Sequence, residues 1–373
     1  MPTLNSSHRW LKPNSYMLAS TVDFNMYECF SQYNLSIDQN YFSVHINYQH
    51  DQNPSDVDLF SYIDTYCTEL LQKSQAKFIF DSISEGSNGM KPNFIQLLER
   101  SAVKHNIPLK NIFYLTIDTA ESKIQSEINI FYFNAVLHMV LSNFDANSVN
   151  ALRPTHLFSC LNRKPRYWRS RLQYELLNTE FKDDILYSHP KVTNIKDFIS
   201  RPYNNKEVEH NANMVKFYSN LEEKFYDDIN QPCTMLSDIF SKVAFDLAML
   251  SVQDRQEEVI DEKVFKPMLA KRPIAIWGIP NINLQGLASL GFKTYEDWFD
   301  LSFDSEADTE TRMHLLVKEI LRLCNHLKSL SPEQLLAWSH KNQSVLDHNY
   351  NLVKDFKINH DSYKQFIRTI NAT

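Results

Sequence analysis

A basic segment between Arg163 and Arg171 has the composition of a phosphate-binding loop. It contains five cations within nine residues, and it follows an apolar stretch, Thr155 to Leu161, that predicts a buried strand. Each guanidinium offers two parallel donors to phosphate oxygens, and the positive end of a helix starting here would add to the attraction. A solvent-exposed basic helix start would have the same composition. The candidate anion-binding residues are Arg163, Lys164, Arg166 and Arg169.

A second segment, from Val259 to Ala270, combines acidic and basic side chains near the predicted start of a helix. Glu262 could accept hydrogen bonds from two hydroxyl groups of a sugar, while Lys263 and Lys266 would supply positive charge for a phosphate. A glutamate in a first helical turn is also an ordinary stabilising residue, worth about 0.3–1 kcal/mol. Both interpretations place Glu262 at a helix N-terminus.

Two acids of the first half, Asp81 and Glu85, follow a predicted strand and lie beside Gly86 in a predicted tight turn. A carboxylate at the carboxyl edge of a sheet could take the proton of a reacting hydroxyl group. We expect Glu85 to act as this base, and Asp81 to support it or to contact an acceptor. The alternative is that Asp81 only binds backbone amides of the turn.

The composition excludes several other classes of site. The chain has only five glycines, and neither G-x-G-x-x-G nor G-x-x-x-x-G-K-[ST] occurs, which argues against the usual dinucleotide and P-loop sites. The five cysteines form no C-x-x-C pair and the histidines form no H-E-x-x-H pair, so we expect no metal site. The net charge of −7 argues against a protein whose whole surface coats nucleic acid.

The sequence contains no run of about 18 apolar residues, and its first thirty residues lack a basic and then apolar leader. Together with the dispersed cysteines, these features predict a soluble, cytoplasmic protein without a membrane span. They carry no information on the oligomeric state.

Strands and helices are predicted to alternate in two series, which is typical of parallel sheets with crossover helices. We predict strands at residues 41–48, 77–81, 111–116, 155–161, 242–249 and 273–277. Between the third and fourth strands, near residue 150, one α/β domain would end and a second begin. The polar stretch from Ser188 to Asn213 is predicted to be an irregular excursion. Ligands of such sheets bind beyond the carboxyl ends of the strands.

Three blocks of the second half resemble a known enzyme family. The block IDEKVFKPMLAKRPIAIWG, from Ile260 to Gly278, resembles the hallmark of the α-1,3/1,4-fucosyltransferases. With LNRKPRYWR (Leu161 to Arg169) and LGFKTYEDWFDLSFD (Leu290 to Asp304), it is still more similar to a group of uncharacterised viral and marine bacterial proteins related to those enzymes. The resemblance covers about residues 155 to 325, whereas the first domain matches weakly.

The resemblance implies a GT-B-like α/β fold, in which two Rossmann-like domains face each other across a cleft and C-terminal helices follow. We therefore assign residues 1–152 to an acceptor-side domain and residues 153–330 to a donor domain. Residues 331–373 would form C-terminal helices that could pack back on the first domain.

The resemblance also implies an inverting transfer from a GDP-sugar or UDP-sugar. No metal would be required, because arginine and lysine would stabilise the charge on the departing nucleotide. By position, Glu262 would hold ribose or sugar hydroxyls, Lys263 would contact the diphosphate, and Arg163 or Arg166 would neutralise the leaving group. The acceptor would be a glycan or a hydroxymethylated DNA base. If the protein is viral, it would act in the host cytoplasm.

The chain departs from the family pattern at three places. Asp261 replaces the usual threonine before Glu262, Asp246 is the only acid between residues 244 and 250, and Leu301 and Phe303 replace polar residues of the third block. Two alternatives to an active glycosyltransferase therefore stay open. The first is a non-catalytic protein that binds a nucleotide or a glycan on the same scaffold, and the second is another phosphoryl- or sugar-nucleotide enzyme.

Overall fold

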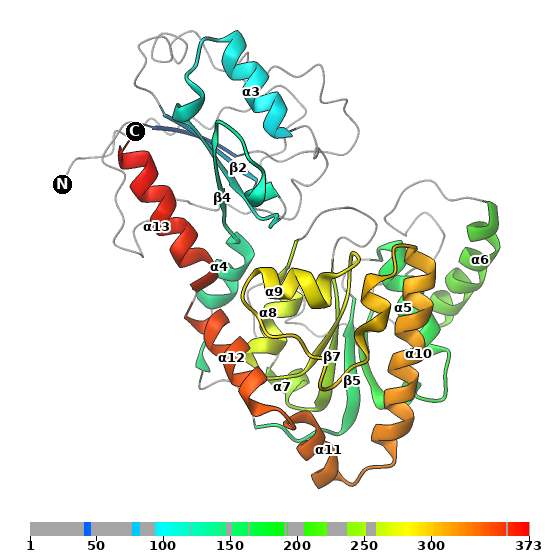
Figure 1. Cartoon of the computed structure of the whole chain (residues 1–373). Coiled ribbons are helices and arrows are strands. Elements are labelled where there is room, and N and C mark those ends of the chain that lie inside the picture. Colours follow the sequence, from blue (N-terminus) through cyan, green and yellow to red (C-terminus); the bar gives the residue numbers. More distant parts are fainter. Residues whose placement is uncertain are drawn as a thin grey trace. The chain divides into compact units, whose positions relative to one another are not determined.

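The computed structural model describes residues 41–45, 77–82, 94–119, 121–142, 144–146, 151–162, 165–189, 192, 205–221, 237–250, 259–355 and 357–372. The chain divides into two compact units (Figure 1). One unit comprises Met1–Ala135 together with Asn359–Thr373, and the other comprises Val136–Ile358. The second unit begins at Val136, the second residue of helix α4 (Ala135–Ser142), whereas the sequence-based assignment began the second domain at residue 153.

Four parallel strands form the sheet of the first unit, in the order β1-β2-β3-β4. Their bounds are Tyr41–His45, Lys77–Ser82, Ile112–Thr116 and Asn129–Tyr132. All five residues of β3 are buried, as expected for a strand of a parallel sheet that is covered on both faces. The α/β class predicted from the sequence is confirmed.

Helix α13 (Lys357–Ala372), near the end of the chain, is part of the core of this first unit. The ring of Phe366 packs edge-on against Phe113 of β3 and Phe131 of β4, with centroid distances of 5.9 and 5.5 Å. At the start of β2, the buried Lys77 donates a hydrogen bond from Nζ to the carbonyl of Ile370. A cation is favourable there because carbonyls of the last helical turn are exposed and carry partial negative charge. Helix α3 (Phe94–Lys104) also belongs to the first unit.

The sheet of the second unit has the strand order β6-β5-β7-β8, and all its strands are parallel. Their bounds are Ile185–Ser188, His156–Leu161, Val243–Met249 and Ile274–Trp277. From β5 the chain first moves outward to β6, and it then returns past β5 to build β7 and β8 on the other side. The strand order therefore reverses between β5 and β7, and this is the position at which open α/β sheets bind their ligands.

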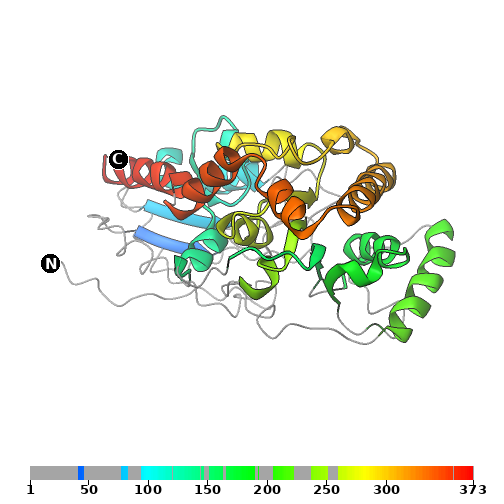
Figure 2. The same ribbon diagram turned by 90° about the horizontal axis from the view of Figure 1, so that it is seen from below.

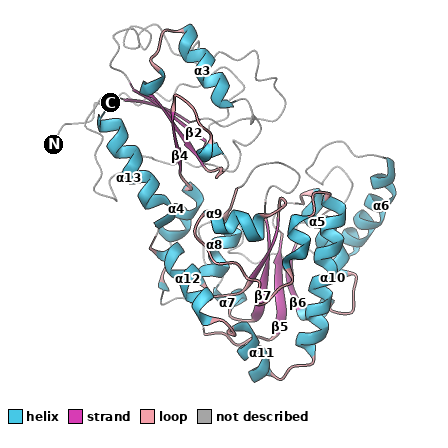
Figure 3. Cartoon of the chain, viewed as in Figure 1, coloured by secondary structure: helices cyan, strands magenta, loops and turns pink. Residues whose placement is uncertain are grey.

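Helices cover both faces of this second sheet (Figure 3). Right-handed crossovers that run in opposite directions place α5 (Tyr167–Leu177) and α8 (Glu262–Leu269) on opposite faces. Helix α10 (Thr309–Lys328) contacts α5, and α12 (Gln343–Lys354) contacts α8. Helix α11 (Pro332–Ser339) contacts β7. The other described helices of the unit are α6 (Asn205–Asn220), α7 (Ser237–Phe240) and α9 (Leu287–Ser289).

Helix α6 packs on α5 and appears in Figure 2 as a light-green helix at the edge of the second unit. The buried Tyr218 of α6 donates a hydrogen bond to the carbonyl of Ser170 at 2.8 Å. The sequence-based prediction of an irregular stretch up to Asn213 was therefore wrong in its last part. None of the described helices combines the length and the apolar composition that a bilayer crossing requires.

The side chain of Asn283 completes the hydrogen bonding of β8. Its Oδ1 accepts the N–H of Ile276 at 2.8 Å, and its Nδ2 donates to the carbonyl of Ile276 at 2.9 Å. The same Nδ2 donates to Asp304 Oδ1 at 2.8 Å. The amide therefore replaces a neighbouring strand at this position, which leaves no unpaired backbone group on Ile276.

Candidate functional site

The predicted anion-binding segments follow the two strands between which the strand order reverses. Strand β5 ends at Leu161 and is followed by the basic segment, while β7 ends at Met249 and leads, through residues 251–258, to α8. Because β5 and β7 are parallel neighbours, their carboxyl ends lie at the same edge of the sheet. Both segments therefore start from the place where a ligand of this fold class is expected.

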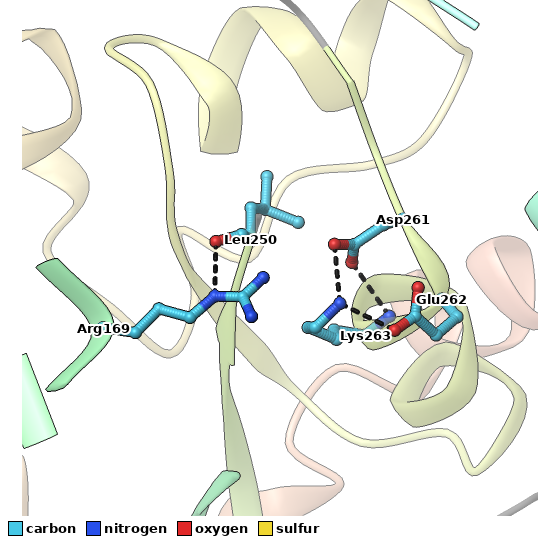
Figure 4. Close-up of polar contacts among 5 residues, drawn as sticks. All are labelled: Arg169, Leu250, Asp261, Glu262 and Lys263. Atoms are coloured by element: carbon cyan, nitrogen blue, oxygen red, sulfur yellow. Dashed lines mark hydrogen bonds and ion pairs between the residues drawn. The ribbon is translucent and has the colours of Figure 1, made fainter. Parts of the chain in front are cut away.

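Arg169 links the first turn of α5 to the end of β7. It is only 2% exposed, and its Nε donates a hydrogen bond to the carbonyl of Leu250 at 2.8 Å (Figure 4). This carbonyl lies directly after β7, so the contact joins the elements that follow the two central strands. The geometry makes Arg169 a positioning residue for this edge of the sheet.

Of the other three candidates of the basic segment, the structure describes one. Arg163 and Lys164 lie outside the described residues. Arg166 is half-buried and is the N-cap residue of α5, with extended backbone angles of −73° and 135°. Helix α5 therefore begins at Tyr167, within the basic segment.

Asn162 is a polar residue of this site to which the sequence analysis assigned no role, although it belongs to the LNRKPRYWR block. It follows β5 directly and is 1% exposed. Its Nδ2 donates to Ser170 Oγ of α5 at 3.3 Å, whereas its buried Oδ1 has no hydrogen-bond partner among the described residues. An unsatisfied buried acceptor is costly, so this oxygen marks a place where a donor from a ligand or water would be favourable.

Gln173 of α5 supports the same edge of the sheet. Its Nε2 donates to the carbonyl of Cys160 at 2.8 Å and to that of Ser188 at 2.9 Å. These bonds connect α5 to the ends of β5 and β6. The basic segment thus leads into a helix whose buried polar side chains hold the strand ends together.

Asp261, Glu262 and Lys263 form a compact charged group at the start of α8. Lys263 Nζ lies 2.8 Å from Asp261 Oδ2 and 2.6 Å from Glu262 Oε1. The backbone N–H of Lys263 also donates to Asp261 Oδ1 at 3.0 Å, which makes Asp261 the N-cap of the helix. The lysine side chain is thereby held beside the two acids (Figure 4).

The structure shows where α8 begins and where its two lysines lie. The helix begins at Glu262, as the sequence analysis expected, and Asp261 caps it. Lys266, which we predicted to bind phosphate, lies in the last turn and is only 5% exposed. Of the predicted lysines, Lys263 is the one at the helix N-terminus.

Asp246 lies within the sheet instead of at its edge. It is a residue of β7, 5% exposed, and accepts a hydrogen bond from Ser159 of the neighbouring β5. Burial raises the pKa of its carboxyl group to about 7, although the hydrogen bond from Ser159 opposes this effect. This acid is a structural group of the strand pair and does not reach the carboxyl edge.

The predicted acids of the first unit are described only in part. Glu85 lies outside the described residues, and so does the side chain of Asp81. The backbone of Asp81 belongs to β2, which extends to Ser82, so the prediction that this residue stands in a turn after the strand was wrong.

A different acid, Glu121, is buried near the end of β3 in the first unit. Its Oε2 accepts hydrogen bonds from Tyr114 at 2.9 Å and from Thr116 at 2.5 Å. Thr116 Oγ1 in turn accepts the N–H of Asp118, which is 1% exposed. The alternation of Tyr114 and Thr116 along β3 puts both hydroxyl groups on one face, and this spacing was a signal that the sequence analysis missed.

Among the residues that the structure describes, no group of three or more histidine, cysteine, aspartate or glutamate side chains could hold a metal ion. No family model, no curated protein and no solved structure matches the chain. The geometry of the site itself is therefore the basis for proposing a function.

Proposed function

We propose that the protein is a glycosyltransferase that uses a nucleotide-sugar donor, built on a GT-B-like arrangement with the donor site in the second unit. The observation that carries the proposal is that two charged segments follow β5 and β7, the parallel neighbours between which the strand order reverses. A buried acceptor, Asn162 Oδ1, lies at the same edge and supports a ligand site there.

The proposed reaction uses the cations of the basic segment as electrostatic catalysts. The oxygen of an acceptor hydroxyl attacks the anomeric carbon of the donor sugar, and the bond from that carbon to the diphosphate breaks. The electron pair of this bond stays on the diphosphate, where Arg163 and Arg166 would stabilise the new charge. The hydroxyl proton passes to a carboxylate base, for which we retain Glu85, with Asp81 in support.

Calorimetric titration with GDP, UDP, ADP and CMP tests the donor site. We expect binding of at least one nucleotide, and a loss of about tenfold in affinity for Arg163→Ala and for Arg166→Ala, since each removes a charge-assisted bond. Arg322→Ala is the matched control, because Arg322 is an exposed residue of α10 that pairs with Glu319. If none of the four nucleotides binds at millimolar concentration, the proposal fails.

Turnover tests the enzymatic step. The isolated protein should slowly hydrolyse the nucleotide-sugar whose nucleotide it binds, with water as the acceptor. Loss of a main charge stabiliser, as in Arg163→Ala, should lower this rate by roughly 10²–10³-fold. A Glu85→Gln variant with unchanged transfer to an added acceptor would refute the assignment of the base.

The acceptor would be a glycan or a hydroxymethylated DNA base. The second case would require the target nucleotide to turn out of the duplex. Mobility-shift assays on duplex DNA at increasing salt concentration distinguish the two, because phosphate contacts weaken steeply with salt. Salt-sensitive DNA binding would favour the base as acceptor.

A non-catalytic nucleotide- or glycan-binding protein is the second candidate function. The observation in its favour is the burial of Asp246, the only acid of segment 244–250, inside the sheet. Under this alternative, a nucleotide would bind without any hydrolysis of its sugar conjugates. Measured turnover would therefore exclude it.

A further inference from the structure

Asn162 is held from two sides directly after β5. Its backbone N–H donates to the carbonyl and to the Oγ of Ser188, the last residue of β6, both at 3.1 Å. Its side-chain Nδ2 donates to Ser170 Oγ of α5 at 3.3 Å. The backbone is thereby fixed to β6 and the side-chain amide to α5. Turning the amide to find another partner for its oxygen would break the bond to Ser170.

The side-chain oxygen of Asn162 is the polar atom that this arrangement leaves unused. The residue is 1% exposed, and its Oδ1 has no hydrogen-bond partner among the described residues. A buried acceptor without a donor is costly, so such atoms in native proteins usually meet a ligand or an ordered water. Asn162 follows one of the two strands between which the strand order reverses, where sheets of this class bind their ligands.

The chemistry of this oxygen restricts which group of a nucleotide-sugar can reach it. An amide oxygen only accepts hydrogen bonds, and the ionised oxygens of a diphosphate also only accept. Hydroxyl groups can donate, and they are carried by both sugars that are bonded to the diphosphate, the ribose and the transferred sugar. The base lies beyond the ribose. With the diphosphate at the basic segment, which begins one residue after Asn162, these hydroxyls are the nearest donors.

We propose that Asn162 is a specificity-determining residue of the donor site, whose Oδ1 accepts a hydrogen bond from a hydroxyl group of the nucleotide-sugar. The inference rests on the proposed function and assigns a residue to the recognition of the donor. A site that buries an acceptor for a substrate hydroxyl discriminates strongly against an analogue without that hydroxyl, because the acceptor is then left unpaired. The ribose and the transferred sugar are the two sources of the hydroxyl.

Calorimetric titration of Asn162→Leu and of the parent protein tests the proposal and separates the two sources. Leucine has a similar shape but no acceptor. If the ribose supplies the hydroxyl, GDP or UDP, whichever binds, should bind Asn162→Leu roughly tenfold more weakly. Either its 2′-deoxy or its 3′-deoxy form, which already lacks the hydroxyl, should bind both proteins equally.

The second source gives a different pattern. If the transferred sugar supplies the hydroxyl, the free nucleotide should bind both proteins within about twofold. At least one of GDP-fucose, GDP-mannose, UDP-glucose and UDP-galactose should then bind Asn162→Leu roughly tenfold more weakly. Both patterns support the inference, because in each the loss is confined to ligands that carry one particular hydroxyl.

Two further variants separate ligand binding from the support of the strand ends. Ser170→Ala removes the contact with Nδ2 but keeps the Oδ1 of Asn162, so it is the matched control and should preserve the preference for the hydroxyl. Asn162→Asp keeps acceptor oxygens and adds a negative charge. It should bind every phosphate-bearing ligand more weakly, and it should also preserve the preference.

The remaining outcomes overturn the inference. Unchanged affinity of Asn162→Leu for every ligand would show that water occupies the place beside Oδ1. Equal weakening of every ligand, both deoxy forms included, would show that Asn162 only supports the strand ends, and so would loss of the preference in Asn162→Asp. In these cases the proposed function stands, because the parent protein still binds a nucleotide. If no nucleotide binds the parent protein, both fail. If thermal melting shows that Asn162→Leu is unfolded, Asn162→Ala replaces it under the same criteria.

Discussion

Arg169 Nε donates a hydrogen bond to the backbone carbonyl of Leu250, 2.8 Å away, and thereby joins the helix after β5 to the end of β7. Both partners are almost completely buried, at 2% and 1% exposure. The contact lies at the edge where we place the donor site. It explains why an arginine of a basic segment can be needed for structure without touching a ligand.

Arg169→Lys should therefore destabilise the second unit. A lysine keeps the charge but cannot reproduce the position of the guanidinium Nε, so the hydrogen bond to the buried carbonyl of Leu250 would be lost. We expect a decrease of about 1–3 kcal/mol in the free energy of unfolding, measured by urea denaturation. Arg322→Lys, at an exposed position of α10, should cost about 1 kcal/mol or less. An equal effect of the two substitutions would contradict the positioning role.

Asp246 should make the stability of the protein depend on pH. Its pKa is raised from 3.8 to about 7 by burial, so the folded state prefers the neutral acid. The stabilisation from this preference is complete below about pH 4 and is lost as the pH rises to about 7, by up to roughly 4 kcal/mol. Asp246→Asn stays neutral, so its stability relative to the parent protein should increase over this range.

The measurement for Asp246 is urea denaturation of both proteins at several pH values between 4 and 8. Asp308→Asn provides a control whose difference from the parent protein should stay constant in this range, because hydrogen bonds from Thr311 lower the pKa of Asp308. The contribution of that carboxylate is present above its ordinary pKa and is lost as the pH falls. A difference between Asp246→Asn and the parent protein that does not change with pH would show that Asp246 is ionised in the folded state.

Asn283→Asp should be strongly destabilising although it preserves the shape of the side chain. The substitution removes the donor to the carbonyl of Ile276 and places a carboxylate beside Asp304, whose Oδ1 now accepts from Asn283 Nδ2 at 2.8 Å. We expect a loss of about 3–5 kcal/mol in the free energy of unfolding at neutral pH.

Asn325→Asp is the matched control for this substitution. Asn325 also donates to a backbone carbonyl, that of Leu321 at 3.0 Å, but it is exposed. Thermal or urea denaturation should show an effect within about 0.5–1 kcal/mol for this variant. Similar costs at both positions would mean that the amide at β8 is not essential.

Phe366→Ala should loosen the first unit while leaving the second intact. The side chain is fully buried and packs against β3 and β4, so its removal should cost about 3–5 kcal/mol. Hydrogen exchange measured by mass spectrometry should become faster in peptides from β3 and stay unchanged in peptides from β5. Phe366→Leu should have a smaller effect of the same kind. Equal acceleration in both sheets would show that the two units unfold together.

The strands that carry the site could be predicted because they are buried on both faces. Strands β5, β7 and β8 each begin one residue after the predicted start and end at the predicted residue. Central strands of parallel sheets have nearly continuous apolar sequences, and such runs are visible without knowledge of the fold.

Strand β6 (Ile185–Ser188) could not be predicted in the same way. It has only four residues and follows the acids Asp183 and Asp184, so its local pattern resembles a loop. What makes it a strand is its pairing with β5, for example between Leu186 and Ser159. Such a long-range contact leaves no periodicity in the sequence.

The site was predictable as a set of charges but not as a set of contacts. Composition indicated that Arg169 and Lys263 lie at helix starts after strands, and both do. Their partners, the carbonyl of Leu250 and the carboxylate of Asp261, depend on distances between elements and on side-chain conformation. For that reason residues that were predicted to face a phosphate turn out to have contacts within the protein.

The return of α13 to the first unit has a consequence for how the protein matures on the ribosome. The first sheet is nearly complete once Tyr132 has been synthesised, yet the ring that packs on β3 and β4 belongs to Phe366, which is made after the whole of the second unit. Domains usually fold in the order in which they emerge. Here Val136–Ile358 can acquire its core before the packing of the first sheet is finished, because α13 emerges after it. Chaperone occupancy during synthesis should accordingly persist on the strands of the first unit until α13 has emerged.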